Sequence, residues 1–446
     1  MKFHALFVLG AALLLGPAAA AQSGETPPEP PALPIEAAPT VPPALPGEPA
    51  PPEPVPVPPA PLPAPAPLPS PAVTPAARAV ALSVVFTETV PTALNGQKIY
   101  ETRREIFNLS EERSKILRAG AKMTLSLRQD VEQFARRLER EAQDARFEYA
   151  PISGEWRLVM RGAVKVDLDA TLAAVESALR DPATRRVNVV YSTIRPARTL
   201  DFFLQKGITS LLGEGSTSYA GSSKARMANI HLGTRNFQDV LLDKNAFSFN
   251  QMVGPVSAAR GYLPGLVIAG ERTASGVGGG ICQVSTTVFR ALYAAGLPVR
   301  ERQNHSYQVH YYDPQGLDAT IYQPNLDLKF DNDTGASLWF QATWDDRTAR
   351  LNIQVFGRPR LETVEVGAPR VLATQAVPPE RLITDPSLAP GRRVQVDWAA
   401  PGATIEVQRV FRRGGEVVRS EVLRSVYRPW PNIYLVGPQG AGTAER

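Results

Sequence analysis

The stretch Gly278-Gly279-Gly280-Ile281-Cys282-Gln283-Val284-Ser285-Thr286-Thr287 contains the single cysteine of this 446-residue chain. Apolar residues recur at helical spacing after it until Gly296, so the pattern predicts a helix that starts at or just after Cys282. Unpaired amides and the dipole at a helix N-terminus lower the pKa of a cysteine, and the glycines let the backbone approach a ligand. The stretch therefore predicts a nucleophilic thiol. The alternative is a small buried apolar side chain.

A thiol nucleophile usually needs a histidine base, and the chain has four histidines. His4 lies in the first residues and His231 on a predicted helix, which leaves His305 and His310. These two are five residues apart on a strand-like run, so they point to opposite faces, and we favour His305. Asp318 begins the next predicted strand and would orient the imidazole, unless it only caps a turn. The spacings fit no zinc motif, and we expect no metal and no cofactor.

The N-terminal segment predicts export. Residues 1–21 have a basic start, a short apolar core and a small-residue cleavage site, which are typical of a signal peptide, with an uncleaved anchor as the alternative. Residues 22–78 form a predicted disordered linker, because Pro27 to Pro75 holds 23 of the 43 prolines. A single cysteine excludes an internal disulfide. We expect a location in the cell envelope, periplasmic, wall-associated or extracellular.

The charge distribution points to an anionic partner. Residues 1–75 carry one basic and five acidic side chains, and the whole chain carries +5, so the remainder carries +9. Such a basic, exported body is expected to meet a wall polymer or a membrane surface. No nucleic-acid recognition motif is present, and no segment after the signal is long enough to predict a membrane span.

The order of predicted elements indicates a multi-domain α+β fold rather than a doubly wound one. Residues 79–204 read as a small α+β unit, residues 205–360 as a mixed α/β core and residues 361–436 as a β-rich module, followed by a disordered tail at 437–446. The predicted helices are Arg128–Gln143, Leu168–Leu179, Ala225–Leu242 and the one after Cys282. The predicted strands are Val80–Phe86, Arg186–Ser192, Phe247–Asn250, Val299–Arg302, Ser306–Tyr312, Ala319–Tyr322, Leu326–Phe330, Ala336–Trp344, Ala349–Phe356, Arg393–Trp398, Thr404–Phe411 and Glu416–Tyr427.

A long ordered set of short motifs lies between about Arg235 and Asn332. Its members are Arg235-Asn236, Phe247-Ser248-Phe249-Asn250, Val253-Gly254-Pro255, Arg260-Gly261-Tyr262, Gly278 through Thr287, Arg302, His305-Ser306, Gly316, Asp318-Ala319-Thr320 and Asp327. This set resembles the VanW domain family. Residues 81–200 resemble the peptidoglycan-binding-like domain that often precedes VanW domains. Residues 362–436 are similar to a G-five domain, with only part of its glycines.

The resemblance implies a cell-wall role related to vancomycin resistance, and some VanW-domain proteins are understood to be L,D-transpeptidases with a cysteine nucleophile. It implies that Cys282, His305 and Asp318 are catalytic and that peptidoglycan stem peptides are the substrate. We assign oxyanion or substrate-binding roles to Gly279, Gly280, Gln283, Arg302, Asn304 and Ser306. The same thiol chemistry suits an amidase or peptidase, and the rival from another class is a non-catalytic wall-binding adaptor. We expect the chemistry to reside in the Arg235–Asn332 core and its flanking strands, so a fragment of about residues 205–360 should keep the thiol reactivity.

Overall fold

The computed structural model describes residues 80–120, 123–181, 183–243, 246–269 and 272–438. The predicted signal peptide, the predicted linker and all of the predicted tail except residues 437–438 lie outside the described residues. The described part contains mixed helices and strands in several sheets, which confirms the α+β prediction. None of its helices is both long and apolar enough to cross a bilayer.

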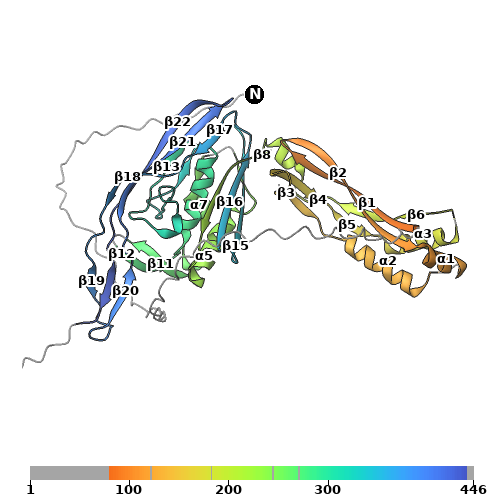
Figure 1. Cartoon of the computed structure of the whole chain (residues 1–446), viewed down its shortest axis with the longest axis horizontal. Coiled ribbons are helices and arrows are strands. Elements are labelled where there is room, and N and C mark those ends of the chain that lie inside the picture. The colour runs from red at the N-terminus through yellow and green to blue at the C-terminus, as the bar shows by residue number, and fades with distance from the viewer. Residues whose placement is uncertain (1–79, 121–122, 182, 244–245, 270–271, 439–446) are drawn as a thin grey trace, which may run out of the picture. The chain divides into compact units, whose positions relative to one another are not determined.

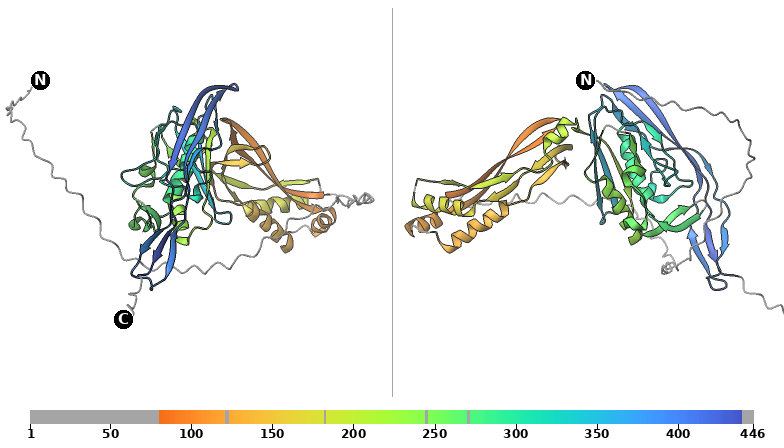
Figure 2. Two further views of the ribbon diagram at one scale, coloured as in Figure 1. Left: turned by 60° about the vertical axis from the view of Figure 1, so that its left-hand side comes forward. Right: turned by 180° about the vertical axis from the view of Figure 1, so that it is seen from behind.

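The first segment is a twisted sheet with helices on one face (Figures 1 and 2). Its elements are β1 (Val80–Leu94), β2 (Gln97–Ser110), α1 (Glu111–Gly120), α2 (Leu125–Leu138), β3 (Gln143–Ala150), β4 (Glu155–Arg161), β5 (Ala163–Val166), α3 (Leu168–Arg180), β6 (Arg186–Asn188), β7 (Tyr191–Ile194) and α4 (Leu200–Gln205). The strand order is β2-β1-β4-β3, and β6 lies parallel to β1. The Asp167 side chain accepts from the Ala170 amide and so caps α3.

The central segment contains the cysteine helix. Its elements are β8 (Ser210–Ser218), α5 (Lys224–Thr234), η1 (Arg235–Phe237), β9 (Val240–Leu242), β10 (Phe247–Ser248), α6 (Phe249–Val253), η2 (Ala258–Arg260), β11 (Pro264–Ala269), β12 (Arg272–Val277), α7 (Ile281–Ala294), β13 (Val299–Glu301), η3 (His310–Tyr312), β14 (Lys329–Phe330), β15 (Leu338–Asp345) and β16 (Arg350–Gly357). Helix α7 packs on the sheet β8-β16-β15-β9 (Figure 1). Its apolar face contributes Val284, Val288 and Leu292 to the main core.

Two glycines on β8 let α7 approach the sheet closely. A Cβ atom on Gly213 would lie 2.4 Å from the carbonyl oxygen of Ala291, and one on Gly215 would lie 2.1 Å from that of Thr287. Both neighbours are backbone atoms of α7, so a side chain on either glycine would push the helix off the sheet. Because α7 carries the cysteine, these glycines also set the position of the thiol.

The C-terminal segment is all β. Its elements are β17 (Thr363–Val366), β18 (Arg370–Gln375), β19 (Arg381–Thr384), β20 (Arg393–Asp397), β21 (Gly402–Arg413), β22 (Glu416–Tyr427) and β23 (Ile433–Val436). The long β21–β22 hairpin lies beside the central segment (Figure 2). Arg409 on β21 is buried and donates to the carbonyls of Tyr293 and Leu297, so it binds the C-terminal end of α7.

The strongest periodic patterns gave correct elements, but two predicted helices end early and two predicted strands are not formed. The helix predicted for Ala225–Leu242 ends at Thr234, and the one predicted for Arg128–Gln143 ends at Leu138. The strand predicted for Ala319–Tyr322 has only isolated bridges at Thr320 and Tyr322. The strand predicted for Ser306–Tyr312 is absent: this part of the described chain contains bends and the short helix η3. The alternation argument that separated His305 from His310 therefore does not apply.

We predict that Gly215→Ala lowers the unfolding free energy by about 3 kcal/mol, because the new methyl group overlaps the backbone of α7. Urea unfolding followed by tryptophan fluorescence measures the effect, since Trp339 and Trp344 lie in the same sheet. Gly120→Ala is the matched control: a Cβ atom there meets nothing within 4 Å, and we expect a change below about 0.5 kcal/mol. Equal midpoints for the two variants would contradict the close approach of α7 to β8.

Candidate active site

The thiol lies at the start of α7. Cys282 is the second residue of the helix, and Gly280 occupies the N-cap position with a φ of 103°. The Cys282 side chain is partly buried against the main core, with Sγ 3.6 Å from Thr320 Oγ1 and 3.8 Å from the carbonyl oxygen of Ile321. The prediction that the cysteine stands at a helix N-terminus is confirmed.

His305 and Asp318 lie together beside this thiol. The Nδ1 atom of His305 is 2.5 Å from Asp318 Oδ2, and the His305 amide donates to the same oxygen at 2.8 Å. With Nδ1 occupied, the other ring nitrogen is left for the hydrogen bond between His305 and Cys282. The imidazole also stacks on the Tyr312 ring, with centroids 4.6 Å apart. The three residues therefore form a line from carboxylate to imidazole to thiol.

Asp318 is held from several directions. Its side chain is 1 % exposed, and its Oδ1 atom accepts from the Tyr427 hydroxyl and from Arg302 at 3.3 Å. Arg302 Nε also donates to the Asp318 carbonyl, and another of its nitrogens donates to Ser425 Oγ at 2.9 Å. The Gly316 amide donates to the Tyr427 hydroxyl at 2.9 Å. Two residues of β22 thus belong to the support of the carboxylate.

The pKa values follow from burial and these contacts. Burial alone would raise the pKa of Cys282, but the hydrogen bond and charge of His305 outweigh it and leave the thiol pKa lowered. Burial would lower the pKa of His305, while Asp318 and Cys282 raise it to about 9. Burial would raise the pKa of Asp318, while His305, Arg302 and Tyr427 lower it to about 2. The shifts favour the charged form of each group: the thiolate, the imidazolium and the carboxylate.

These shifts also link stability to pH. The pKa of His305 in the folded state, about 9, lies above its ordinary 6.5, so its stabilising effect is complete below pH 6.5 and is lost as the pH rises through about 9. The pKa of Asp318, about 2, lies below its ordinary 3.8, so its effect is complete above pH 3.8 and is lost as the pH falls through about 2. The pair therefore stabilises the fold across the neutral range.

Three residues predicted to bind an oxyanion or substrate have structural contacts. The Gly279 carbonyl accepts from Asn229, and Gly280 forms the left-handed turn before α7. Gln283 is fully buried, its side chain donates to Thr217 Oγ1, and its amide donates to the Gly280 carbonyl. The Ile281 amide likewise donates to a loop carbonyl. The expected oxyanion amides of this stretch are thus largely engaged within the loop and helix.

The other predicted residues surround the base. Arg302 binds Asp318, and Asn304 is buried and donates to the carbonyls of His305 and Val426. The Ser306 carbonyl accepts from the Arg428 amide. These contacts fix the loop that carries His305. His310 is exposed on η3 and stacks on Tyr311, away from the Asp318 carboxylate that holds His305.

The sequence analysis missed Tyr427, Arg409 and Asn229. Tyr427 lies outside residues 205–360, and its hydroxyl donates a hydrogen bond to Asp318. Asn229 is fully buried and joins the Leu263 backbone to the Gly279 carbonyl. A polar amide on the apolar face of a predicted helix is the signal that points to Asn229. Tyr427 shows no such signal, because tyrosine is an ordinary residue of a strand.

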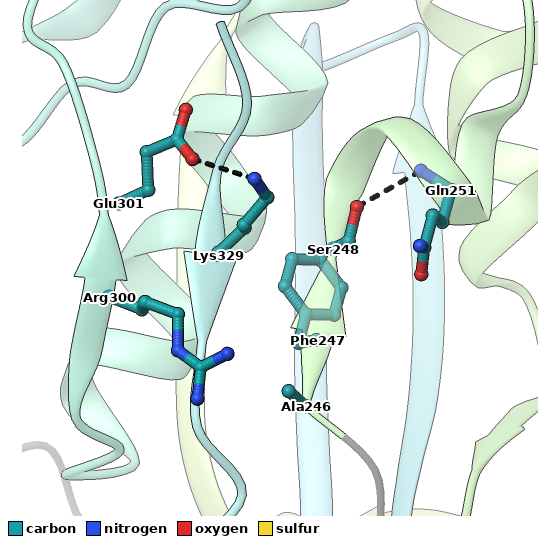
Figure 3. Close-up of a pocket in the computed structure, with 7 residues that line it drawn as sticks. All are labelled: Ala246, Phe247, Ser248, Gln251, Arg300, Glu301 and Lys329. Carbon is teal, nitrogen blue, oxygen red and sulfur yellow. Dashed lines mark hydrogen bonds and ion pairs between the residues drawn. The ribbon is translucent and has the colours of Figure 1, made fainter. Parts of the chain in front are cut away.

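A separate pocket of about 400 Å³ lies between β10, β13 and β14 (Figure 3). Lys329 pairs there with Glu301 at 2.8 Å, and Arg300 pairs with Asp331. Its lining does not include Cys282, His305 or Asp318. Within the described ranges, no three His, Cys, Asp or Glu side chains are grouped so that they would hold a metal ion.

A family model described as "VanW like protein" matches residues 225–354. These residues form a VanW-like domain, and the domain contains Cys282, His305 and Asp318. The domain is 39% identical over 125 residues to the "Uncharacterized protein YoaR" of Bacillus subtilis, covering 28% of this chain and 41% of that protein. It is 28% identical over 127 residues to the "Vancomycin B-type resistance protein VanW" of Enterococcus faecalis, covering 27% and 46%. The match spans less than half the length of each relative.

Two solved structures are similar to part of this chain. They are "IgA1 Protease G5 domain structure", with 21% identity, a TM-score of 0.12 and coverage of 18% of this chain and 94% of that one, and "Crystal structure of HP0197-G5", with 21% identity, a TM-score of 0.10 and coverage of 17% and 97%.

We predict that His305→Ala slows the reaction of Cys282 with iodoacetamide at pH 7 by about tenfold or more, because the thiol loses the imidazolium that lowers its pKa. The measurement is the alkylation rate across pH 5–10 by mass spectrometry of the intact protein. His310→Ala, an exposed histidine on the same loop, is the control and should react within about twofold of the wild type. Equal slowing by both variants would show that His305 does not set the thiol pKa.

We further predict that Tyr427→Phe moves the alkylation profile of Cys282 to higher pH, by a few tenths to about one unit. Without the hydroxyl, Asp318 binds its proton more readily and holds a weaker imidazolium. Tyr434→Phe makes the same change on β23 and should leave the profile in place. A profile for Tyr427→Phe that coincides with the wild type would mean that the hydroxyl does not support the site.

Proposed function

We propose that this protein is an exported cell-wall enzyme that transfers acyl groups of peptidoglycan stem peptides through Cys282, in the manner of an L,D-transpeptidase. The observation that carries the proposal is the line from the buried Asp318 and His305 to the partly buried Cys282, with the lowered pKa of the thiol. The wall as the site of action is supported by the VanW-like domain and by the relative named as a vancomycin resistance protein.

Cys282, His305 and Asp318 each have a separate role in the proposed reaction. The Cys282 thiolate attacks a peptide carbonyl, and an S–C bond forms. The His305 imidazolium gives its proton to the leaving amine, which departs as the C–N bond breaks. An amine of a second stem, or water, then attacks the thioester and restores the thiolate, while His305 takes up the proton. Asp318 keeps the imidazole oriented throughout.

The oxyanion needs donors that are not engaged elsewhere. The Ile281 and Gln283 amides donate to loop carbonyls. We therefore assign this role to the Cys282 amide and the Thr320 hydroxyl, whose oxygen is 3.6 Å from Sγ.

The adaptor alternative needs a thiol that is sealed in the core. Cys282 is instead only partly buried and shares a hydrogen bond with His305. A fully structural cysteine has no need of an imidazole held by a buried carboxylate. These contacts favour the enzyme over the adaptor.

The test is turnover of synthetic stem peptides by the purified chain, with and without an acceptor amine. We expect the wild type to release the terminal residue and to accumulate a thioester adduct visible by mass spectrometry, and Cys282→Ala to lose at least about 10³-fold in rate. His310→Ala controls for general damage to the loop. Products formed at the wild-type rate by Cys282→Ala would overturn the proposal, and products formed only with water would indicate a peptidase.

A further inference from the structure

Arg226 lies beside the cysteine helix and has no acidic partner among the residues that the structure describes. It belongs to the first turn of α5, and a Cβ atom on Gly280 would lie 3.0 Å from Arg226 Cγ and 3.1 Å from its carbonyl oxygen. Since Gly280 caps α7 two residues before Cys282, Arg226 lies against the N-terminus that carries the thiol.

Tyrosines connect Arg226 to the base. Its guanidinium lies over the Tyr311 ring, 3.9 Å from the centroid, and forms a hydrogen bond with Tyr312. The Tyr312 ring in turn stacks on His305. The Tyr312 side chain therefore lies between Arg226 and the proposed base, His305. Arg226 also packs against Gly280, two residues before the proposed nucleophile.

The charge of Arg226 lacks a counter-ion. The residue is 9 % exposed, and its side chain donates to Ser222 Oγ at 2.6 Å. No Asp or Glu among the described residues lies within 4.0 Å of its guanidinium, whereas the buried Arg302 and Arg409 pair with Asp318 and Glu421. The contact with Tyr311 offsets only part of the cost of burying a cation. The planar guanidinium of Arg226 has parallel N–H donors, and in this buried position it is suited to bind a carboxylate.

We propose that Arg226 binds a carboxylate of the substrate next to the bond that Cys282 attacks. The inference rests on the proposed function, because a stem peptide cleaved before its last residue carries its free terminal carboxylate one residue away from the attacked carbonyl. Arg226 would then select donor strands with a free C-terminus over strands that are amidated or already cross-linked there.

The test compares two alkylating reagents that differ only in charge. In both, the Cys282 thiolate forms an S–C bond at the methylene carbon and iodide leaves; iodoacetate carries a carboxylate and iodoacetamide does not. The measured quantity is the ratio of the two rates, which cancels changes in thiol pKa or exposure because they affect both reagents alike. The variants are Arg226→Gln, Arg226→Lys and, as control, Arg347→Gln, which removes an exposed positive charge in the turn after β15.

We expect Arg226→Gln to reduce the ratio of iodoacetate to iodoacetamide rates by about 5- to 50-fold, Arg226→Lys to reduce it less, and Arg347→Gln to leave it unchanged. An unchanged ratio in Arg226→Gln would overturn this inference and leave the proposed function standing. A folded wild-type protein that reacts with neither reagent would overturn both.

Discussion

The site depends on one buried negative charge, the carboxylate of Asp318. A carboxylate that is 1 % exposed has lost its water, and this loss is tolerated only where donors replace it. The backbone and ring of His305, the guanidinium of Arg302 and the hydroxyl of Tyr427 supply those donors. Because each donor has its own fixed position in the fold, satisfying this one group also fixes the imidazole.

Segments far apart in the sequence meet at that charge. The loop after β13 supplies Arg302 and His305, and β22 supplies Tyr427 more than a hundred residues later. Helix α7 is fixed at its two ends, by the turn at Gly280 and by Arg409 against its last carbonyls. The C-terminal hairpin therefore acts on both parts of the candidate site: it contacts the base through Asp318 and the thiol through α7.

The sequence predicted the local features of this site better than its long-range ones. The cysteine at a helix start follows from the glycines and the apolar spacing, which are properties of neighbouring residues. His305 was chosen over His310 through an alternating strand that does not exist, so the structure supports the choice for a different reason, the contact with Asp318. The role of Tyr427 could not be predicted from the sequence. It depends on the pairing of β21 with β22 and on the packing of that hairpin against the 316–318 loop, and no local pattern encodes these long-range contacts.

The charged groups of the described site carry a net positive charge. With all three groups charged, the thiolate and the Asp318 carboxylate are matched by the imidazolium and by Arg302, which leaves Arg226 and Arg290 as additional positive charges. Once the thiolate attacks a carbonyl, its negative charge moves onto the substrate oxygen, so the positive groups around it must stabilise charge on the ligand rather than on the protein. A substrate carboxylate bound to Arg226 neutralises the positive charge of that residue before the reaction begins. The imidazolium is then the positive group that acts on the reacting bond. The same electrostatics thus couples the binding of the substrate to the state of the nucleophile.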